Sequence, residues 1–187
     1  MTAARRNMWI GIAAVAAVQV AVLCWMIWDR IHLLTTGREI VLEVVPVDPR
    51  SLFQGDYVVL NYDISRVDVQ ASAGQVRRGD TIYVTLQKSA DGKWKAMQAS
   101  ATPPAGTGPD QVVLKGRVQF TTSTIPAQST LNYGIENYFV PEGTGRELEK
   151  LVGDKKIAAL IAVDADGNAG IKGLIVDGQR VYEEPLF

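Results

Sequence analysis

Hydrophobic positions form one unbroken run near the start of the chain and short alternating runs after it. Within the long apolar segment, residues 8–28, Gln19 is the only strongly polar side chain. At a rise of about 1.5 Å per residue, a helix of this length reaches about 30 Å, the thickness of the hydrocarbon layer of a bilayer. Trp9, Trp25 and Trp28 lie near its two ends, where indole rings favour the headgroup level. The pattern therefore predicts a single transmembrane helix over residues 8–28.

The charges on either side of this run predict its orientation. Arg5 and Arg6 precede the run without nearby acids, whereas Asp29 and Arg30 cancel after it. Cytoplasmic flanks of membrane helices carry the excess of Lys and Arg, so we expect the N-terminus in the cytoplasm and the body outside the inner (cytoplasmic) membrane. The expected organisation is a cytoplasmic N-terminus at 1–7, the anchor at 8–28, a juxtamembrane linker at 29–38 and a periplasmic or otherwise extracytoplasmic β domain at 39–187.

Three other interpretations of the apolar run stay open. A cleaved signal peptide would have a shorter apolar core and small residues at its cleavage site, but the pair Ala14 and Ala16 falls in the middle of the run. A lipoprotein signal would need a small residue before the modified cysteine, and Leu23 precedes Cys24. A buried core helix is disfavoured because the stretch is apolar on all sides. The anchor is the preferred interpretation, and whether it is ever cleaved is left open.

From Arg38 onward the pattern changes to short runs of Val, Ile, Thr and Tyr separated by Gly, Pro, Asp and Asn, which is typical of strands and turns. The dipeptide Asp91-Gly92 between two such runs predicts a hairpin. Residues 145–152 predict one short helix, with Thr144 as its N-cap. The predicted strands are 39–47, 57–64, 81–87, 93–100, 112–121, 157–163, 170–176 and 180–182, with an aromatic segment at 132–140. This pattern favours a mainly β fold, a small β-barrel or sandwich-like domain with one short helix.

The net charge and the counts of cysteine and histidine exclude several kinds of binding site and catalytic site. Beyond residue 30 the body carries 16 basic and 19 acidic residues, so it is mildly acidic as a whole, and we expect it not to bind nucleic acid. The only cysteine, Cys24, lies in the apolar run, so the chain has no intramolecular disulfide and no thiolate metal cluster. The only histidine, His32, lies just after that run, so the body lacks a catalytic histidine base. We expect no cofactor and no metal, although whether the domain is an enzyme stays uncertain.

Two groups of acidic residues are weak candidates for chemistry. Asp164, Asp166 and Asn168 resemble an oxygen-rich calcium turn, but a hairpin turn explains the same residues, and the distal glutamate of a full calcium loop is missing. Glu142 and Glu147 would be a carboxylate pair for glycoside chemistry, but nothing in the sequence sets their separation.

The string Gly55-Asp56-Tyr57-Val58-Val59-Leu60-Asn61-Tyr62 is the most distinctive motif of the body. In a strand, Leu60 and Tyr62 share one face, which is most simply the core, while Tyr57 and Asn61 share the other. The string resembles the GDYXXLXY family of membrane-anchored bacterial proteins at Gly, Asp, Tyr, Leu and Tyr. The flanking VDPRSLFQ and DIS, the later YGIENYFVPEGTGRELE and the N-terminal anchor are similar to that family too. The resemblance implies an anchored extracytoplasmic domain, sometimes found with multi-pass membrane domains, and no established activity.

A more distant likeness is to the β domain of type I signal peptidases. Gly55-Asp56 and Arg78-Gly79-Asp80 are similar to two of their segments. That alignment puts Val47 in the position of the nucleophile, and an alkyl side chain cannot attack a carbonyl. Ser51 with Lys88 as its base is the only nearby substitute, and its position is displaced from that of the nucleophile, so the likeness implies a degenerate, non-catalytic relative.

These observations favour a non-enzymatic, partner-binding or accessory module for a membrane-protein complex. The expected partners are the lipid bilayer and a multi-pass membrane protein, with no nucleic acid. The alternatives are a degenerate signal-peptidase-like hydrolase and a module that binds envelope glycans or small molecules through the aromatic segment 132–140. The candidate recognition surface comprises Arg50, Gly55, Asp56, Tyr57, Tyr62, Tyr133, Glu136, Tyr138 and Glu142.

Overall fold

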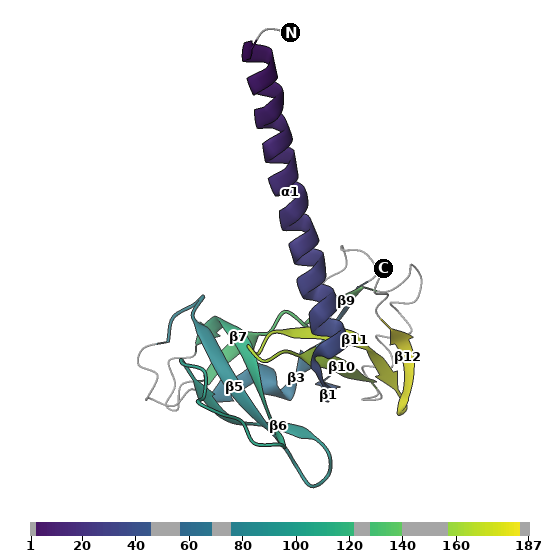
Figure 1. The fold of residues 1–187 in the computed structure, drawn as a ribbon. Helices are drawn as coiled ribbons and strands as arrows, with labels where there is room; N and C mark the ends of the chain where they lie inside the picture. The colour runs from purple at the N-terminus through teal and green to yellow at the C-terminus, as the bar shows by residue number, and fades with distance from the viewer. Residues whose placement is uncertain (1–2, 46–56, 69–75, 122–127, 140–156, 184–187) are drawn as a thin grey trace.

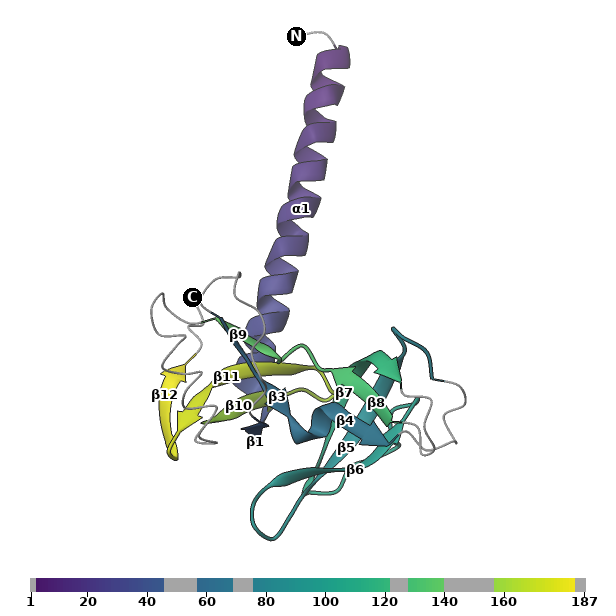
Figure 2. The same ribbon diagram turned by 180° about the vertical axis from the view of Figure 1, so that it is seen from behind.

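The structure, a computed structural model, describes residues 3–45, 57–68, 76–121, 128–139 and 157–183. It is mainly β, with one long N-terminal apolar helix followed by a near-closed five-stranded barrel and a second five-stranded sheet. Figure 1 shows the helix standing out from the β domain, and Figure 2 shows the same arrangement from behind. The predicted fold class is therefore confirmed, whereas the predicted short helix at 145–152 lies outside the described residues.

The helix α1 covers Ala3–Thr36. Within the described part of the chain, its portion Asn7–Thr36 is the one helix long and apolar enough to cross a membrane, a property shared by membrane anchors and signal sequences. From Met8 to Trp28 its large apolar side chains are exposed on all sides. Its last turns differ, because Leu33 and Leu34 are 9% and 4% exposed and α1 packs there against the β domain.

The helix ends where it meets the first strand. The N–H of Gly37 donates to the carbonyl oxygen of Leu33 at 3.0 Å, and a Cβ atom at Gly37 would clash with that same oxygen. Glycine therefore permits the chain to turn directly from α1 into the strand that begins at Arg38. Within the predicted juxtamembrane linker 29–38, residues 29–36 continue the helix for about two turns.

The first five-stranded sheet lies at the base of the helix and is antiparallel throughout. Its strands run in the order β12-β11-β10-β1-β3. The bounds are β1 Arg38–Val45, β3 Asn61–Tyr62, β10 Ile157–Val163, β11 Ala169–Val176 and β12 Gln179–Glu183. In β1 the buried residues alternate at Ile40, Leu42 and Val44, as the pattern predicts for a strand with one face on the core. Strand β10 is almost entirely buried, and α1 packs against β10 and β11.

The second sheet curls into the near-closed barrel, with the order β4-β8-β7-β5-β6 and contacts between its edge strands β4 and β6. Its strands are β4 Arg66–Asp68, β5 Thr81–Lys88, β6 Trp94–Ser100, β7 Gln111–Thr121 and β8 Gln128–Asn132. The predicted hairpin joins β5 and β6, and Gly92 takes a positive φ of 82° in its turn. A separate ribbon pairs β2, Tyr57–Val59, with β9, Asn137–Phe139.

Two predicted elements are interrupted in the structure. The predicted strand 57–64 is split into β2 and β3 and ends in the 3-10 turn η1, Asp63–Ser65. The aromatic segment 132–140 is split by a turn at Gly134, whose φ is 80°. Strands β4 and β8 were not predicted, because β4 has three residues and the sequence QSTLN of β8 shows little apolar alternation.

Candidate functional site

The family motif and the later aromatic block lie together in the fold. Strand β2 pairs with β9 so that Tyr57 is opposite Phe139 and Val59 is opposite Asn137. One residue further along, the N–H of Leu60 donates to the carbonyl oxygen of Glu136 at 2.7 Å. Two segments about 75 residues apart in the chain are thus held by backbone hydrogen bonds, so the motif acts first as a structural joint.

Two tyrosines reinforce this joint from opposite directions. The hydroxyl of Tyr62 donates to the carbonyl oxygen of Ile135 at 2.8 Å, and the hydroxyl of Tyr133 donates to that of Ile64 at 2.7 Å. We call Tyr62 and Tyr133 the tyrosine pair. Both side chains are buried, and burial, followed by the nearby carboxylate of Glu136, raises the pKa of each phenol well above its usual value. Both hydroxyls therefore stay protonated as hydrogen-bond donors.

Glu136 holds the turn between β8 and β9. Its two carboxylate oxygens accept the N–H groups of Tyr133 at 2.6 Å and Gly134 at 2.9 Å. The side-chain oxygen of Asn132 also accepts from Gly134 at 2.9 Å. The carboxylate thus satisfies the backbone donors of a tight turn, in which Gly134 adopts a left-handed conformation.

The structure brings some of the predicted recognition residues together, but inside the domain. Tyr62, Tyr133 and Tyr138 are buried, and Glu136 is engaged by the turn. The rings of Tyr133 and Tyr138 are therefore not available to stack on a sugar. Tyr57 is described only through its backbone pairing in β2. Four members of the predicted surface lie outside the described residues, so a recognition role for them stays a prediction: Arg50, Gly55, Asp56 and Glu142.

A cleft of about 920 Å³ opens at the base of the helix, and the sequence did not predict it. One wall is the helix, with Asp29, His32 and Thr36. The other walls are the outer side of β5 and β7, the loop from Pro103 to Thr107, and the β10–β11 turn. We call it the helix-base cleft. It exists because residues 29–36 continue the helix beside the domain, a rigid arrangement that a flexible linker would not provide.

Arg38 holds the loop that forms one wall of this cleft. Its guanidinium donates to the carbonyl oxygens of Pro109 and Gln111, the latter at 2.9 Å, and lies 5.5 Å from the centre of the Trp94 ring. Because Arg38 is the first residue of β1, it ties the loop to the end of the helix. Its charge is used by these contacts rather than directed at a ligand.

The turn that the sequence presents as a calcium candidate forms another wall. One carboxylate oxygen of Asp164 accepts the N–H groups of Asp166 at 2.9 Å and Asn168 at 2.8 Å, and the other accepts the side-chain amide of Asn168 at 2.8 Å. The carbonyl oxygen of Gly167 accepts the N–H of Lys115, which docks the turn on β7. The hairpin interpretation accounts for these contacts. Across the described ranges, no three His, Cys, Asp or Glu residues are placed to hold a metal ion.

The residues of the signal-peptidase likeness are only partly described. Val47 and Ser51 lie outside the described residues. Lys88 ends β5, where its side chain is exposed and its N–H donates to the carbonyl oxygen of Asp110 at 2.9 Å. Gly79 of the Arg78-Gly79-Asp80 segment takes a φ of 93° in the turn before β5.

One apolar N-terminal helix that continues into a barrel-and-sheet β domain defines the class of this protein. The model of the GDYXXLXY protein family matches residues 19–174, and the chain belongs to that family. This membership indicates no biochemical function. The matched residues include both segments of the tyrosine pair, so the joint described above lies within the family's shared part. Neither the curated proteins nor the solved structures contain a match to the chain.

Proposed function

We propose that the chain is a membrane-anchored, non-enzymatic module that binds a membrane-protein partner in the helix-base cleft, on the outer side of the membrane. The helix supports the anchoring, since its large apolar side chains between Met8 and Trp28 are all more than half exposed. An apolar surface of that extent is unfavourable in water and suited to lipid. Arg5 and Arg6 support the orientation, because positive flanks stay in the cytoplasm.

One observation carries the proposal: the helix runs without a break from the apolar span into the β domain. Asp29 and His32 follow Trp28 directly, and Leu33 and Leu34 are already packed on the domain. At a rise of about 1.5 Å per residue, the cleft begins within about 6 Å of the end of the apolar span. The cleft is thus held at the membrane surface, where the loops of a multi-pass membrane protein emerge.

The charges of the cleft fit binding better than catalysis. Arg38 is held by two carbonyl oxygens, and the carboxylate of Asp164 is saturated by its own turn. Asp29, Asp166 and Lys115 are the charged lining residues without such contacts among the described residues. Carboxylates and an ammonium spread around an open cleft offer complementary contacts to a polypeptide segment, which supports recognition of a protein loop.

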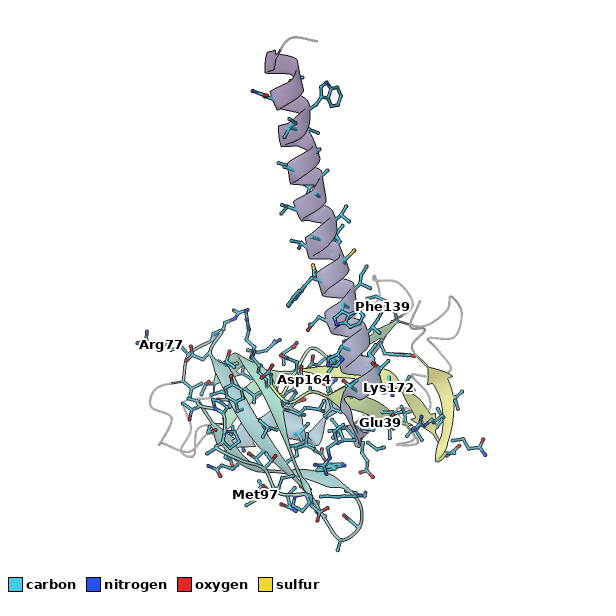
Figure 3. The ribbon with its side chains drawn as sticks, viewed as in Figure 1. Glu39, Arg77, Met97, Phe139, Asp164 and Lys172 are labelled. Atoms are coloured by element: carbon cyan, nitrogen blue, oxygen red, sulfur yellow. The ribbon has the colours of Figure 1, made fainter. Side chains whose placement is uncertain are left out.

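Site-specific photocrosslinking in native membranes tests the proposal. A photoreactive amino acid at His32 or Lys115, within the cleft, is expected to give one discrete adduct with a membrane protein. The matched control position is Met97, which is 65% exposed and lies on the side of the domain away from the helix (Figure 3). A tryptophan at the exposed cleft residue Thr107 should obstruct the cleft and remove the adduct.

Two results would overturn the proposal. One is the same set of adducts from Met97 as from the cleft positions, because recognition would then not be localised at the helix base. The other is an adduct that persists unchanged when Thr107 is replaced by tryptophan. Capture of a soluble small molecule instead of a protein, detected by mass spectrometry of the purified chain, would favour a ligand-binding module, since about 920 Å³ also suits a small ligand.

A further inference from the structure

A second surface of the barrel combines exposed cations with an exposed aromatic ring. Strand β7 lies on the side of the barrel turned toward the N-terminal end of the helix in both views, and Figure 2 shows β8 beside it (Figures 1 and 2). Figure 3 shows Arg77, in the turn before β5, on this same side. We call this surface the basic face, and its residues are Arg66, Arg77, Arg78, Arg117 and Phe120.

Strand register places two of these side chains, Arg66 and Phe120, on one outer surface. Thr130 of β8 is opposite Arg66 of β4 on one side and opposite Phe120 of β7 on the other. Its neighbours along the strand, Ser129 and Leu131, are buried, so Thr130 and the residues paired with it point outward. Arg66 and Phe120 therefore flank the same position of β8.

The outward direction of Phe120 comes from a β-bulge. Along β7 the inward residues alternate through Leu114, Gly116 and Val118, so a regular strand would turn residue 120 into the core as well. The register shifts between Val118 and Phe120, and Phe120 is 57% exposed as a result. Bulges commonly redirect a side chain for a purpose other than packing.

Two guanidinium groups border one small depression on this face. Arg78 and Arg117 line a pocket of about 240 Å³ together with Gln119 and Asn132. No ion pair to Arg66, Arg77, Arg78 or Arg117 occurs within the ranges that the structure describes. The acids of the same elements are Asp68 and Asp80, and Asp80 accepts the backbone N–H of Arg77 at 2.8 Å. The face thus keeps an excess of positive charge.

We infer that the basic face docks on the anionic lipid headgroups of the membrane that α1 spans, an inference that rests on the membrane anchoring proposed above. Leu33, already packed on the domain, is five residues beyond Trp28, or about 7.5 Å along the helix. The headgroup layer on each side of a bilayer is about 5 to 7 Å thick. The point where the domain first packs on the helix therefore lies at the outer edge of the headgroup layer, and the side of the barrel turned toward the span borders that layer. Cations pair there with lipid phosphates while Phe120 enters the interface.

Reconstitution of the full chain into vesicles tests the docking. Cys24→Ser and Gln119→Cys together give one labelling site beside Phe120 for an environment-sensitive dye, and Cys24→Ser with Met97→Cys gives the control site on the far side. In vesicles containing anionic phosphatidylglycerol, the dye at position 119 is expected to shift its emission to the blue and to be protected from aqueous iodide. In vesicles of phosphatidylcholine alone, the dye at position 119 should show a smaller blue shift and weaker protection from iodide. The dye at position 97 should show neither effect with either lipid.

A matched pair of double variants identifies the charges responsible. Arg78→Gln with Arg117→Gln removes two cations from the basic face, whereas Lys88→Gln with Lys95→Gln removes two exposed cations from the β5–β6 hairpin. Each cation near an anionic surface changes the ratio of docked to undocked domains roughly five-fold, so the loss of two arginines should lower that ratio about 25-fold. The lysine variant should behave like the unaltered chain.

The possible outcomes separate this inference from the proposed function. Equal emission in anionic and neutral vesicles, or equal effects of the two double variants, overturns the docking while leaving the anchor intact. A blue shift produced in neutral vesicles by inorganic phosphate, but not by sodium chloride of equal ionic strength, overturns it in favour of a small-anion site. Release of the chain from the vesicles by alkaline carbonate overturns the proposed anchoring, and with it the basis of the docking.

Discussion

Replacing Tyr62 by phenylalanine removes one hydroxyl from the joint between the family motif and the β8–β9 turn. The ring still fills its space, so the change isolates the hydrogen bond to Ile135 at 2.8 Å. Because the site is buried, no water replaces the lost donor, and the carbonyl oxygen of Ile135 is left without this partner. An unsatisfied buried group of this kind costs roughly 1 to 3 kcal/mol.

The expected size of the effect can be compared with a control. For a domain of about 150 residues, a loss of roughly 2 kcal/mol lowers the melting temperature by about 4 to 8 °C. Tyr83→Phe is the matched control, since Tyr83 is half-buried and its hydroxyl makes no hydrogen bond among the described residues. That control should change the free energy of unfolding by less than about 0.5 kcal/mol. The assay is thermal and urea unfolding of the full chain in detergent, followed by β-sheet circular dichroism.

The second tyrosine makes the test stricter. Tyr133→Phe should cost a similar amount, because its hydroxyl donates to Ile64 at 2.7 Å in the opposite direction. Both hydrogen bonds join the same two segments, so losing one weakens the other. The loss of unfolding free energy in the double variant should therefore be smaller than the sum of the two single losses, with a difference of more than about 0.5 kcal/mol. Costs below about 0.5 kcal/mol for both single variants, or strict additivity, would refute the role assigned to the pair.

Three further predictions concern the pH dependence of stability, the glycine that ends the helix and the ion pairs of Glu39. Tyr62 and Tyr133 have raised pKa values in the folded chain, so as the pH rises their phenols lose protons in the unfolded chain before they do in the folded chain. The free energy of unfolding should therefore fall above about pH 10, by up to about 2.7 kcal/mol per pH unit for the two phenols together, which urea unfolding from pH 9 to 11 measures. Gly37→Ala should destabilise the chain by roughly 1 to 3 kcal/mol in thermal unfolding because its Cβ would clash with a helix carbonyl, whereas Gly106→Ala, with open space around it, should not. Glu39→Gln removes the ion pairs to Lys172 at 2.7 Å and Arg180 at 3.1 Å, and it should cost less than about 0.5 kcal/mol of stability because these groups are partly exposed. The hydrogen bond to Lys172 lowers the pKa of Glu39, so this stabilisation is present above about pH 4.5 and is lost as the pH falls through the lowered pKa.

Much of the β architecture could be predicted because local patterns and tertiary structure agree. Alternation in β1 places Ile40, Leu42 and Val44 in the core, and Asp91-Gly92 encodes its own turn through the left-handed glycine. Leu60 and Tyr62 share the buried face, as the period of two requires. In these elements the position of a residue along the strand is enough to predict whether its side chain is buried or exposed.

The parts that escaped prediction depend on contacts between distant segments. The charged residues Asp29 and Arg30 look like the start of a linker, but Leu33 and Leu34 find a packing surface on β10 and β11 that extends the helix. The helix-base cleft follows from that extension, so it was missed as well. The bulge at Phe120 gives no local signal, since a phenylalanine in a strand is ordinarily a core residue.

The central claim is that α1 crosses the membrane with the β domain on the outer side. Cys24 is the only cysteine, so Cys24→Ser gives a background for single-cysteine accessibility in intact cells. With a membrane-impermeant maleimide, Met97→Cys should label in intact cells, and Ala4→Cys only after the membrane is permeabilised. Labelling of position 4 from outside, with position 97 protected, would contradict the account.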